Sequence, residues 1–199
     1  GTSVWLNGQP MDQVAGWWLT FLVLTIVAER LELSRLVSPP KVSVAFLCVL
    51  VTLLIFGAAR GEYSYASAPL TGLGLTGCAV WLLRYDIARR TVRMKGSTRF
   101  AAVCMLAGHF WLGVTGLLLL IVPPATAAFS YDAVVHTLAI GFVLSMVFGH
   151  APIILPAVTG LRVVYTPIAY LPLALLHISL MLRVCSDLFE WTELRAASG

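Results

Sequence analysis

Long apolar segments alternate with short polar ones along most of this chain, and the pattern predicts helices that cross a membrane. A spanning helix needs about 20 consecutive apolar residues. Because hydrocarbon offers no partner to backbone amides and carbonyls, unbroken apolar runs of this length favour α-helices over the strands of a barrel. The expected spans, about six in number, are residues 13–36, 41–59, 68–83, 100–122, 131–158 and 166–184.

Proline and polar residues separate these spans. The pairs at 39–40 and 123–124 break the chain, because proline lacks the backbone donor that a continuing helix needs. Pro152 and Pro156 are expected to kink or end the fifth span for the same reason. The polar tail after residue 184 predicts a short interfacial helix. No cleavable signal is expected in residues 1–13, which have neither a basic start nor an apolar centre.

The composition supports a lipid solvent. Hydrophobic residues make up 59% and charged residues 11% of the chain, against about 25% charged in soluble domains. The sequence therefore predicts an all-α, polytopic membrane helical bundle, with residues 1–199 forming a single domain.

The basic residues indicate an orientation rather than a nucleic-acid partner. The net charge is +4, but the arginines and lysines gather beside the spans, mostly in the loop at residues 84–99. The positive-inside rule then makes this loop cytoplasmic and puts both termini outside, in a bacterial-type inner membrane.

Charged residues also end the first span. Glu32 and Arg35 are expected to pair at the headgroup level. Glu29 and Arg30 are expected there too, the alternative being a position inside the bilayer as a proton or haem-propionate contact. In the third span a GxGxxG pattern lacks its strand–turn–helix context, so close helix packing is expected instead. The four cysteines form no CxxC or CxxCH and are expected to be small core residues: Cys48, Cys78, Cys104 and Cys185.

All four histidines lie inside predicted spans. His136 and His150 are fourteen positions apart, which at 100° per residue is 40° short of four turns, so both should leave one helix face roughly 21 Å apart. Distances to the nearest charged loop residues suggest two pairs at different depths, His136 with His177 and His109 with His150. Buried imidazoles can bind haem iron or copper, the alternative being plain hydrogen bonds between helices.

Further residues extend this metal hypothesis. Each methionine within a span stands four positions from a histidine, as in Met105–His109, Met146–His150 and His177–Met181. Thioether with imidazole suits copper, the alternative being that methionine fills irregular space. Small residues around the histidines would admit a porphyrin or another helix: Gly108, Gly113, Gly141 and Gly149. Arg162 and Arg183 are candidate propionate partners. No GxSxG, HExxH or pair of carboxylates within the spans indicates hydrolysis.

Three stretches resemble a known family. His136–Thr–Leu–Ala–Ile–Gly141, with Met146 five positions on, resembles the HALTVGxxGxM stretch of NnrS-type proteins. LAGHFWLGVTGLLLL is similar to their LHLxYLWLxxGLLLL span, and AYLPLALLHISLMLRV to a later one. The resemblance covers roughly residues 100–184 and implies a haem- and copper-containing membrane protein linked to nitric oxide, reminiscent of haem–copper oxidases.

These observations predict an integral membrane redox protein that binds one or two b-type haems, with copper as a further candidate. Its work would be electron transport across the bilayer, or nitric oxide or oxygen chemistry, with other membrane subunits, a redox protein or quinone as partner. The alternatives are a non-catalytic subunit of a larger complex and a histidine-lined transporter.

Overall fold

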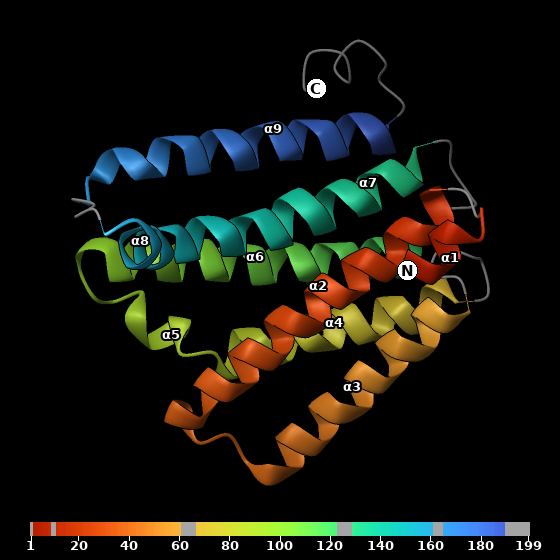
Figure 1. Ribbon diagram of the computed structural model, residues 1–199, viewed down its shortest axis with the longest axis horizontal. Coiled ribbons are helices and arrows are strands. Elements are labelled where there is room, and N and C mark those ends of the chain that lie inside the picture. Colours follow the sequence, from red (N-terminus) through yellow and green to blue (C-terminus); the bar gives the residue numbers. More distant parts are fainter. Residues whose placement is uncertain (1, 9–10, 61–66, 123–128, 161–164, 190–199) are drawn as a thin grey trace.

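A computed structural model describes residues 2–8, 11–60, 67–122, 129–160 and 165–189. These residues form helices and short helical turns, with no strand among them, as predicted (Figure 1). Here α denotes a helix and η a 3-10 or π-helical segment. In chain order the elements are α1 (Thr2–Leu6), α2 (Met11–Ser34), η1 (Arg35–Val37), α3 (Lys41–Ala59), α4 (Ala68–Tyr85), α5 (Ala88–Thr91), α6 (Gly96–Ile121), α7 (Ser130–His136), η2 (Thr137–Leu144), α8 (Ser145–Thr159), η3 (Pro167–Ala169) and α9 (Tyr170–Leu188).

Every predicted span has its counterpart among these helices. Five helical segments in the described residues are long and apolar enough to cross a membrane: α2 with η1, α3, α6, α7 through η2 into α8, and η3 with α9. The remaining predicted span, residues 68–83, corresponds to α4, an 18-residue helix that is not among those five, so the predicted number of six membrane spans stays a prediction. The interfacial helix predicted for the tail lies outside the described residues, apart from its first few positions.

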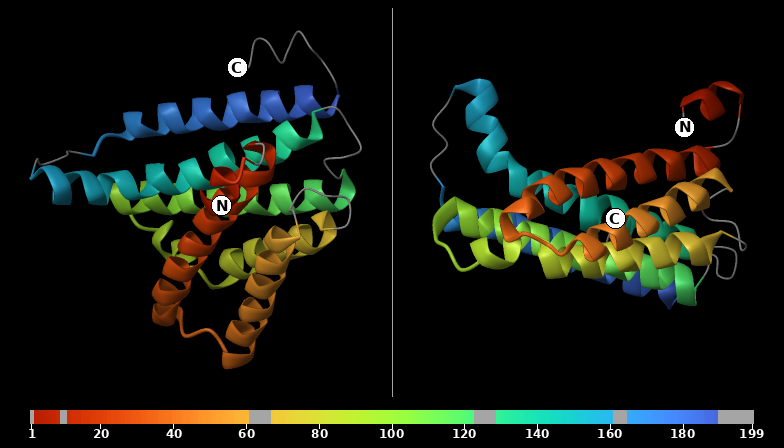
Figure 2. Two further views of the ribbon diagram at one scale, coloured as in Figure 1. Left: turned by 45° about the vertical axis from the view of Figure 1, so that its right-hand side comes forward. Right: turned by 90° about the horizontal axis from the view of Figure 1, so that it is seen from below.

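Helix α6 is the central element of the bundle. It packs against α4 on one side and against η2 and α8 on the other, and α4 in turn packs against α3. Helix α9 lies along the outer side of α7 and η2, and α2 packs against α3, α4 and η2 (Figures 1 and 2). Buried leucines such as Leu112 and Leu119 fill the space between α6 and its neighbours. The packing therefore buries α4, α6 and the segment from α7 into α8 most deeply and leaves apolar side chains exposed on α3 and α9.

Glycines allow the central helices to approach closely. A Cβ on Gly72 would lie 2.8 Å from the carbonyl oxygen of Gly116, and one on Gly149 would lie 3.1 Å from that of Ala101. Gly72 belongs to the GxGxxG pattern, so the predicted packing role is confirmed. Gly149 brings α8 against α6, which is the helix contact expected as the alternative to a porphyrin.

The fifth predicted span is not one regular helix. Residues Thr137–Leu144 are π-helical, so the 100° step between His136 and His150 does not hold across them. Pro152 and Pro156 both lie within α8, whose last turns swing away from the line of η2 (Figure 2).

The cysteine prediction was right for two residues and wrong for two. Cys78 and Cys104 are buried, whereas Cys48 and Cys185 are exposed. The exposed pair lies on α3 and α9, peripheral helices whose outer faces carry mostly apolar residues. On such a face a small apolar side chain is compatible with lipid as well as with a core.

Candidate functional site

The candidate site is built around an arginine in the buried stripe of α2. Val23, Val27, Arg30 and Ser34 follow one another at helical spacing and are all buried, with Arg30 only 1% exposed. A buried guanidinium needs partners to offset its lost hydration. Its neighbours Glu32 and Arg35 lie at the surface, where they form the predicted ion pair at 3.0 Å.

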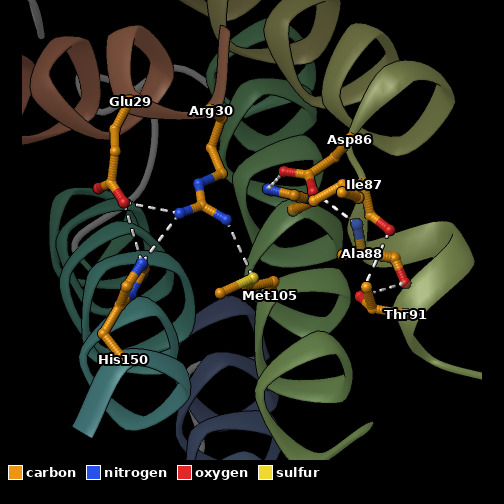
Figure 3. A network of polar contacts seen from close by, with 9 residues as sticks. Glu29, Arg30, Asp86, Ile87, Ala88, Thr91, Met105 and His150 are labelled. Carbon is orange, nitrogen blue, oxygen red and sulfur yellow. Dashed lines mark hydrogen bonds and ion pairs between the residues drawn. The ribbon is translucent and has the colours of Figure 1, made fainter. Parts of the chain in front are cut away.

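Three side chains from three helices surround the Arg30 guanidinium (Figure 3). One terminal nitrogen, Nη2, lies 2.7 Å from Oε1 of Glu29 and 2.9 Å from Nε2 of His150. The other, Nη1, donates to the sulfur of Met105 at 3.1 Å. The arginine therefore ties α2 to α6 and α8 through polar contacts.

The ring of His150 has a defined tautomer. Its Nδ1 atom lies 2.6 Å from the carbonyl oxygen of Met146, and since a carbonyl only accepts, Nδ1 carries a proton. In the neutral ring Nε2 then accepts from Arg30. In the protonated ring Nε2 instead donates to Glu29, whose Oε1 is 3.1 Å away. The two protonation states thus select two different partners.

Asp86 and His109 lie on the other side of Arg30. Oδ1 of Asp86 accepts the backbone N–H of Ala88 at 2.7 Å, and Oδ2 lies 3.6 Å from Nε2 of His109. Asp86 is 2% exposed and His109 fully buried. Burial raises the pKa of the Asp86 carboxyl, while the Ala88 N–H and the Arg30 charge act to lower it. Both residues therefore belong to the electrostatic surroundings of Arg30.

His109 and His150, which were predicted to bind one metal together, lie in the same polar cluster. Their rings do not face a common metal position. The two residues lie on α6 and α8, which pack together. Each ring has another residue as its polar neighbour: Asp86 for His109, Arg30 and Glu29 for His150. With Arg30 at 2.9 Å, Nε2 of His150 has no room for an iron atom in this arrangement.

The second predicted pair lies at a common level. Arg183 of α9 contacts Asp132 of α7 at 3.9 Å. Counted along the helices from that contact, His136 is about 6 Å away and His177 about 9 Å. The predicted similarity of depth is therefore compatible with the packing of α7 on α9.

The tautomers of these two histidines differ. Nδ1 of His136 lies 2.6 Å from the carbonyl oxygen of Asp132, so it donates and leaves Nε2 with a free lone pair. Trp111 donates its indole N–H to Nδ1 of His177 at 3.0 Å, with the two rings stacked 18° from parallel. The proton of neutral His177 is therefore on Nε2, and that nitrogen is a donor rather than a metal ligand.

The remaining predicted residues have varied positions. Met105 is buried on Arg30, and Met146 is buried near Gly108. Met181 is 57% exposed on α9, away from the bundle interior. Arg183 contacts Asp132 and Asp187, the latter at 3.4 Å. Arg162 lies outside the described residues.

Among the four histidines, His136 has the geometry most compatible with an axial haem ligand. Metal-binding histidines typically donate their second ring N–H to a carbonyl or carboxylate, which fixes the ring. His136 meets that condition and keeps Nε2 available. Arg183, the predicted propionate partner, is already paired with Asp132 and Asp187, so its charge is not free for a propionate. Within the described residues no group of three or more histidine, cysteine or acidic side chains is arranged to hold a metal ion.

Sequence reasoning did not identify Asp86 or Trp111 as site residues. Asp86 stands in a strongly basic loop, where a single carboxylate suggests surface charge balance. Trp111 reads as an ordinary apolar residue of a span. Arg30 had a usable signal, because it continues the three- and four-residue spacing of Val23 and Val27.

Comparison with known proteins identifies a family rather than an activity. No curated protein and no solved structure matched the chain. A family model described as "Domain of unknown function (DUF8744)" matches residues 1–199. The chain therefore belongs to the DUF8744 family.

Proposed function

We propose that this chain is an integral membrane redox protein that binds b-type haem, with His136 as an axial ligand. The observation that carries the proposal is the free Nε2 of His136, fixed by the Nδ1–H donated to Asp132. Neutral imidazole with its second nitrogen held in this way suits haem iron. The bound haem would supply one-electron chemistry, and the protein would supply the ligand and its setting.

The surroundings of His136 support this assignment. Its helix belongs to an apolar segment of membrane-spanning length. Arg183, on the neighbouring helix, pairs with Asp132 and Asp187 and so links α9 to the turn that precedes His136. The same proposal includes three finer expectations: nitric oxide or oxygen chemistry, a copper site, and a redox protein or quinone as partner.

An absorption spectrum of the purified protein tests the haem assignment. We expect a reduced-minus-oxidised b-type spectrum that disappears in His136→Ala, with haem content checked by the pyridine haemochrome assay. The matched control is His177→Gln, because the glutamine oxygen can still accept from Trp111 and the parent ring offers no free lone pair at Nε2. Colourless wild-type protein, purified from cells supplied with haem, would overturn the proposal.

A second candidate is proton transfer through the membrane, favoured by the Glu29–His150 contact. A carboxylate and an imidazole 3.1 Å apart can exchange a proton, and ionisable residues at membrane depth often form proton relays. In vesicles with a pH-sensitive dye inside, this function predicts proton flux that Glu29→Gln abolishes. Glu32→Gln, which removes the neighbouring surface carboxylate, should leave the flux unchanged.

A further inference from the structure

The connection between α4 and α6 forms a strongly basic cavity. Arg84, Arg89, Arg90 and Arg93 line a space of about 450 Å³, together with Val37 and Asp86. All four arginines are exposed, and none forms an ion pair among the residues that the structure describes. Arg84 lies over the ring of Tyr85, and Arg89 donates to the Arg84 carbonyl oxygen at 3.2 Å. Neither contact neutralises a charge.

Among the described residues, the one carboxylate that lines this cavity does not balance the arginines. Asp86 is buried, and its Oδ1 is already held by the Ala88 N–H. Burial also raises the pKa of its carboxyl, which favours the neutral form. The cavity therefore carries an excess of positive charge.

An apolar groove continues from the basic cavity. Three of the arginines, Arg84, Arg89 and Arg93, also line a neighbouring groove of about 570 Å³. Its other walls are apolar side chains of α4, α6 and the turn after α5: Val80, Leu83, Val92 and Leu106. Val80 is 62% exposed on the outer face of α4. Charge and apolar surface thus meet along one continuous wall.

We propose that this cavity and groove form a binding site for an anionic phospholipid, with the phosphodiester headgroup on the arginines and an acyl chain along Val80, Leu83 and Leu106. Guanidinium groups bind phosphate oxygens in bidentate fashion. Basic pockets at the cytoplasmic ends of membrane helices recognise anionic headgroups. A free phosphate would use the arginines but not the apolar walls. The inference rests on the proposed membrane placement but not on haem.

Lipid binding by the full-length protein in detergent tests this site. Native mass spectrometry would compare phosphatidylglycerol with phosphatidylcholine of the same acyl chains. We expect clear preference for phosphatidylglycerol, weakened about 30-fold in the double variant Arg89→Gln, Arg93→Gln, since each arginine near a headgroup contributes about 1 kcal/mol. The control is Lys95→Gln with Arg99→Gln, which removes equal charge from residues that do not line the cavity or the groove, and should lose less than about threefold.

Two further arms separate the sources of the phosphate. Val80→Ser should weaken phosphatidylglycerol binding, and millimolar inorganic phosphate should fail to displace the lipid. Equal loss in both double variants, no preference between the lipids, or full displacement by inorganic phosphate would each overturn the proposal. Two measurements distinguish a failure of this proposal from a failure of the proposed function. They are the haem spectrum of the Arg89→Gln, Arg93→Gln double variant and the lipid binding of His136→Ala.

Discussion

The Nη2 atom of Arg30 lies 2.9 Å from Nε2 of His150, although 120 positions separate the two residues in the sequence. This contact closes α2 against α8 at the end of the bundle where α5 also lies. Because the positive charge of Arg30 also acts to lower the pKa of the buried Asp86 carboxyl, the arginine influences both halves of the polar cluster. Its removal should therefore affect stability as well as any proton chemistry.

Arg30→Met should lower the free energy of unfolding by about 1–3 kcal/mol, because it removes the hydrogen bonds of a charged group with Glu29, His150 and Met105. Thermal or denaturant unfolding in detergent measures the change. Arg35→Met is the matched control. Its pair with Glu32 is 76% and 64% exposed at the side chains, so the loss should stay below about 1 kcal/mol. Equal effects at the two positions would contradict the assignment of a buried role to Arg30.

The contact of α4 with α6 depends on Gly72. A methyl group there would lie 2.8 Å from the Gly116 carbonyl oxygen, a backbone atom that cannot rotate away. Gly72→Ala should therefore cost about 1–3 kcal/mol through overpacking. Gly113→Ala is the control on α6, where the added Cβ would lie 3.4 Å from that of Ala79. That variant should be neutral or slightly stabilising, since alanine favours helices over glycine by about 1 kcal/mol.

The stacked pair Trp111 and His177 should be energetically coupled. Trp111→Phe removes the N–H that Nδ1 of His177 accepts at 3.0 Å, and the net loss should be about 1 kcal/mol. A double-mutant cycle with His177→Phe isolates the pair. We expect a coupling energy of about 0.5–1.5 kcal/mol from unfolding measurements. Strict additivity of the two changes would mean that the indole and the imidazole do not interact.

The sequence predicted most of the helices but few of the contacts at the candidate site. Apolar runs and prolines placed the spans, because in a membrane the length and continuity of a run are physical requirements. The α3 span agrees at both ends, and the GxGxxG glycines pack as expected. The π-helical turn after His136 could not be foreseen, because no residue type in Thr137–Leu144 specifies it.

The hydrogen-bond partners of the histidines could not be predicted from the sequence either. Spacing along one helix gives the direction of a side chain, but the partner comes from the crossing of two helices. Arg30 and His150 come together where Gly149 lets α8 approach α6 and where α2 packs against η2, the segment that leads into α8. The tautomers of His136 and His177 depend on atoms such as the Asp132 carbonyl and the Trp111 indole, which a pattern of apolar and polar residues does not place.

Asp86 should make stability depend on pH in a specific direction. Burial is the largest influence and raises the pKa of the carboxyl, although Ala88 and Arg30 oppose it. The folded chain therefore holds this proton to higher pH than the unfolded chain, whose aspartates titrate near about 3.9. The contribution of Asp86 to stability is complete below that value and is lost as the pH rises through the raised, folded-state pKa.

Asp86→Asn cannot ionise and keeps an oxygen for the Ala88 N–H. Its melting temperature should match the wild type near about pH 4 and exceed it near about pH 7, by about 2–4 °C for each kcal/mol. A gap that is constant with pH would show that the fold does not shift the pKa of Asp86. A wild type that gains on Asp86→Asn as the pH rises would show that the carboxylate is stabilised in the fold, with Arg30 dominating over burial.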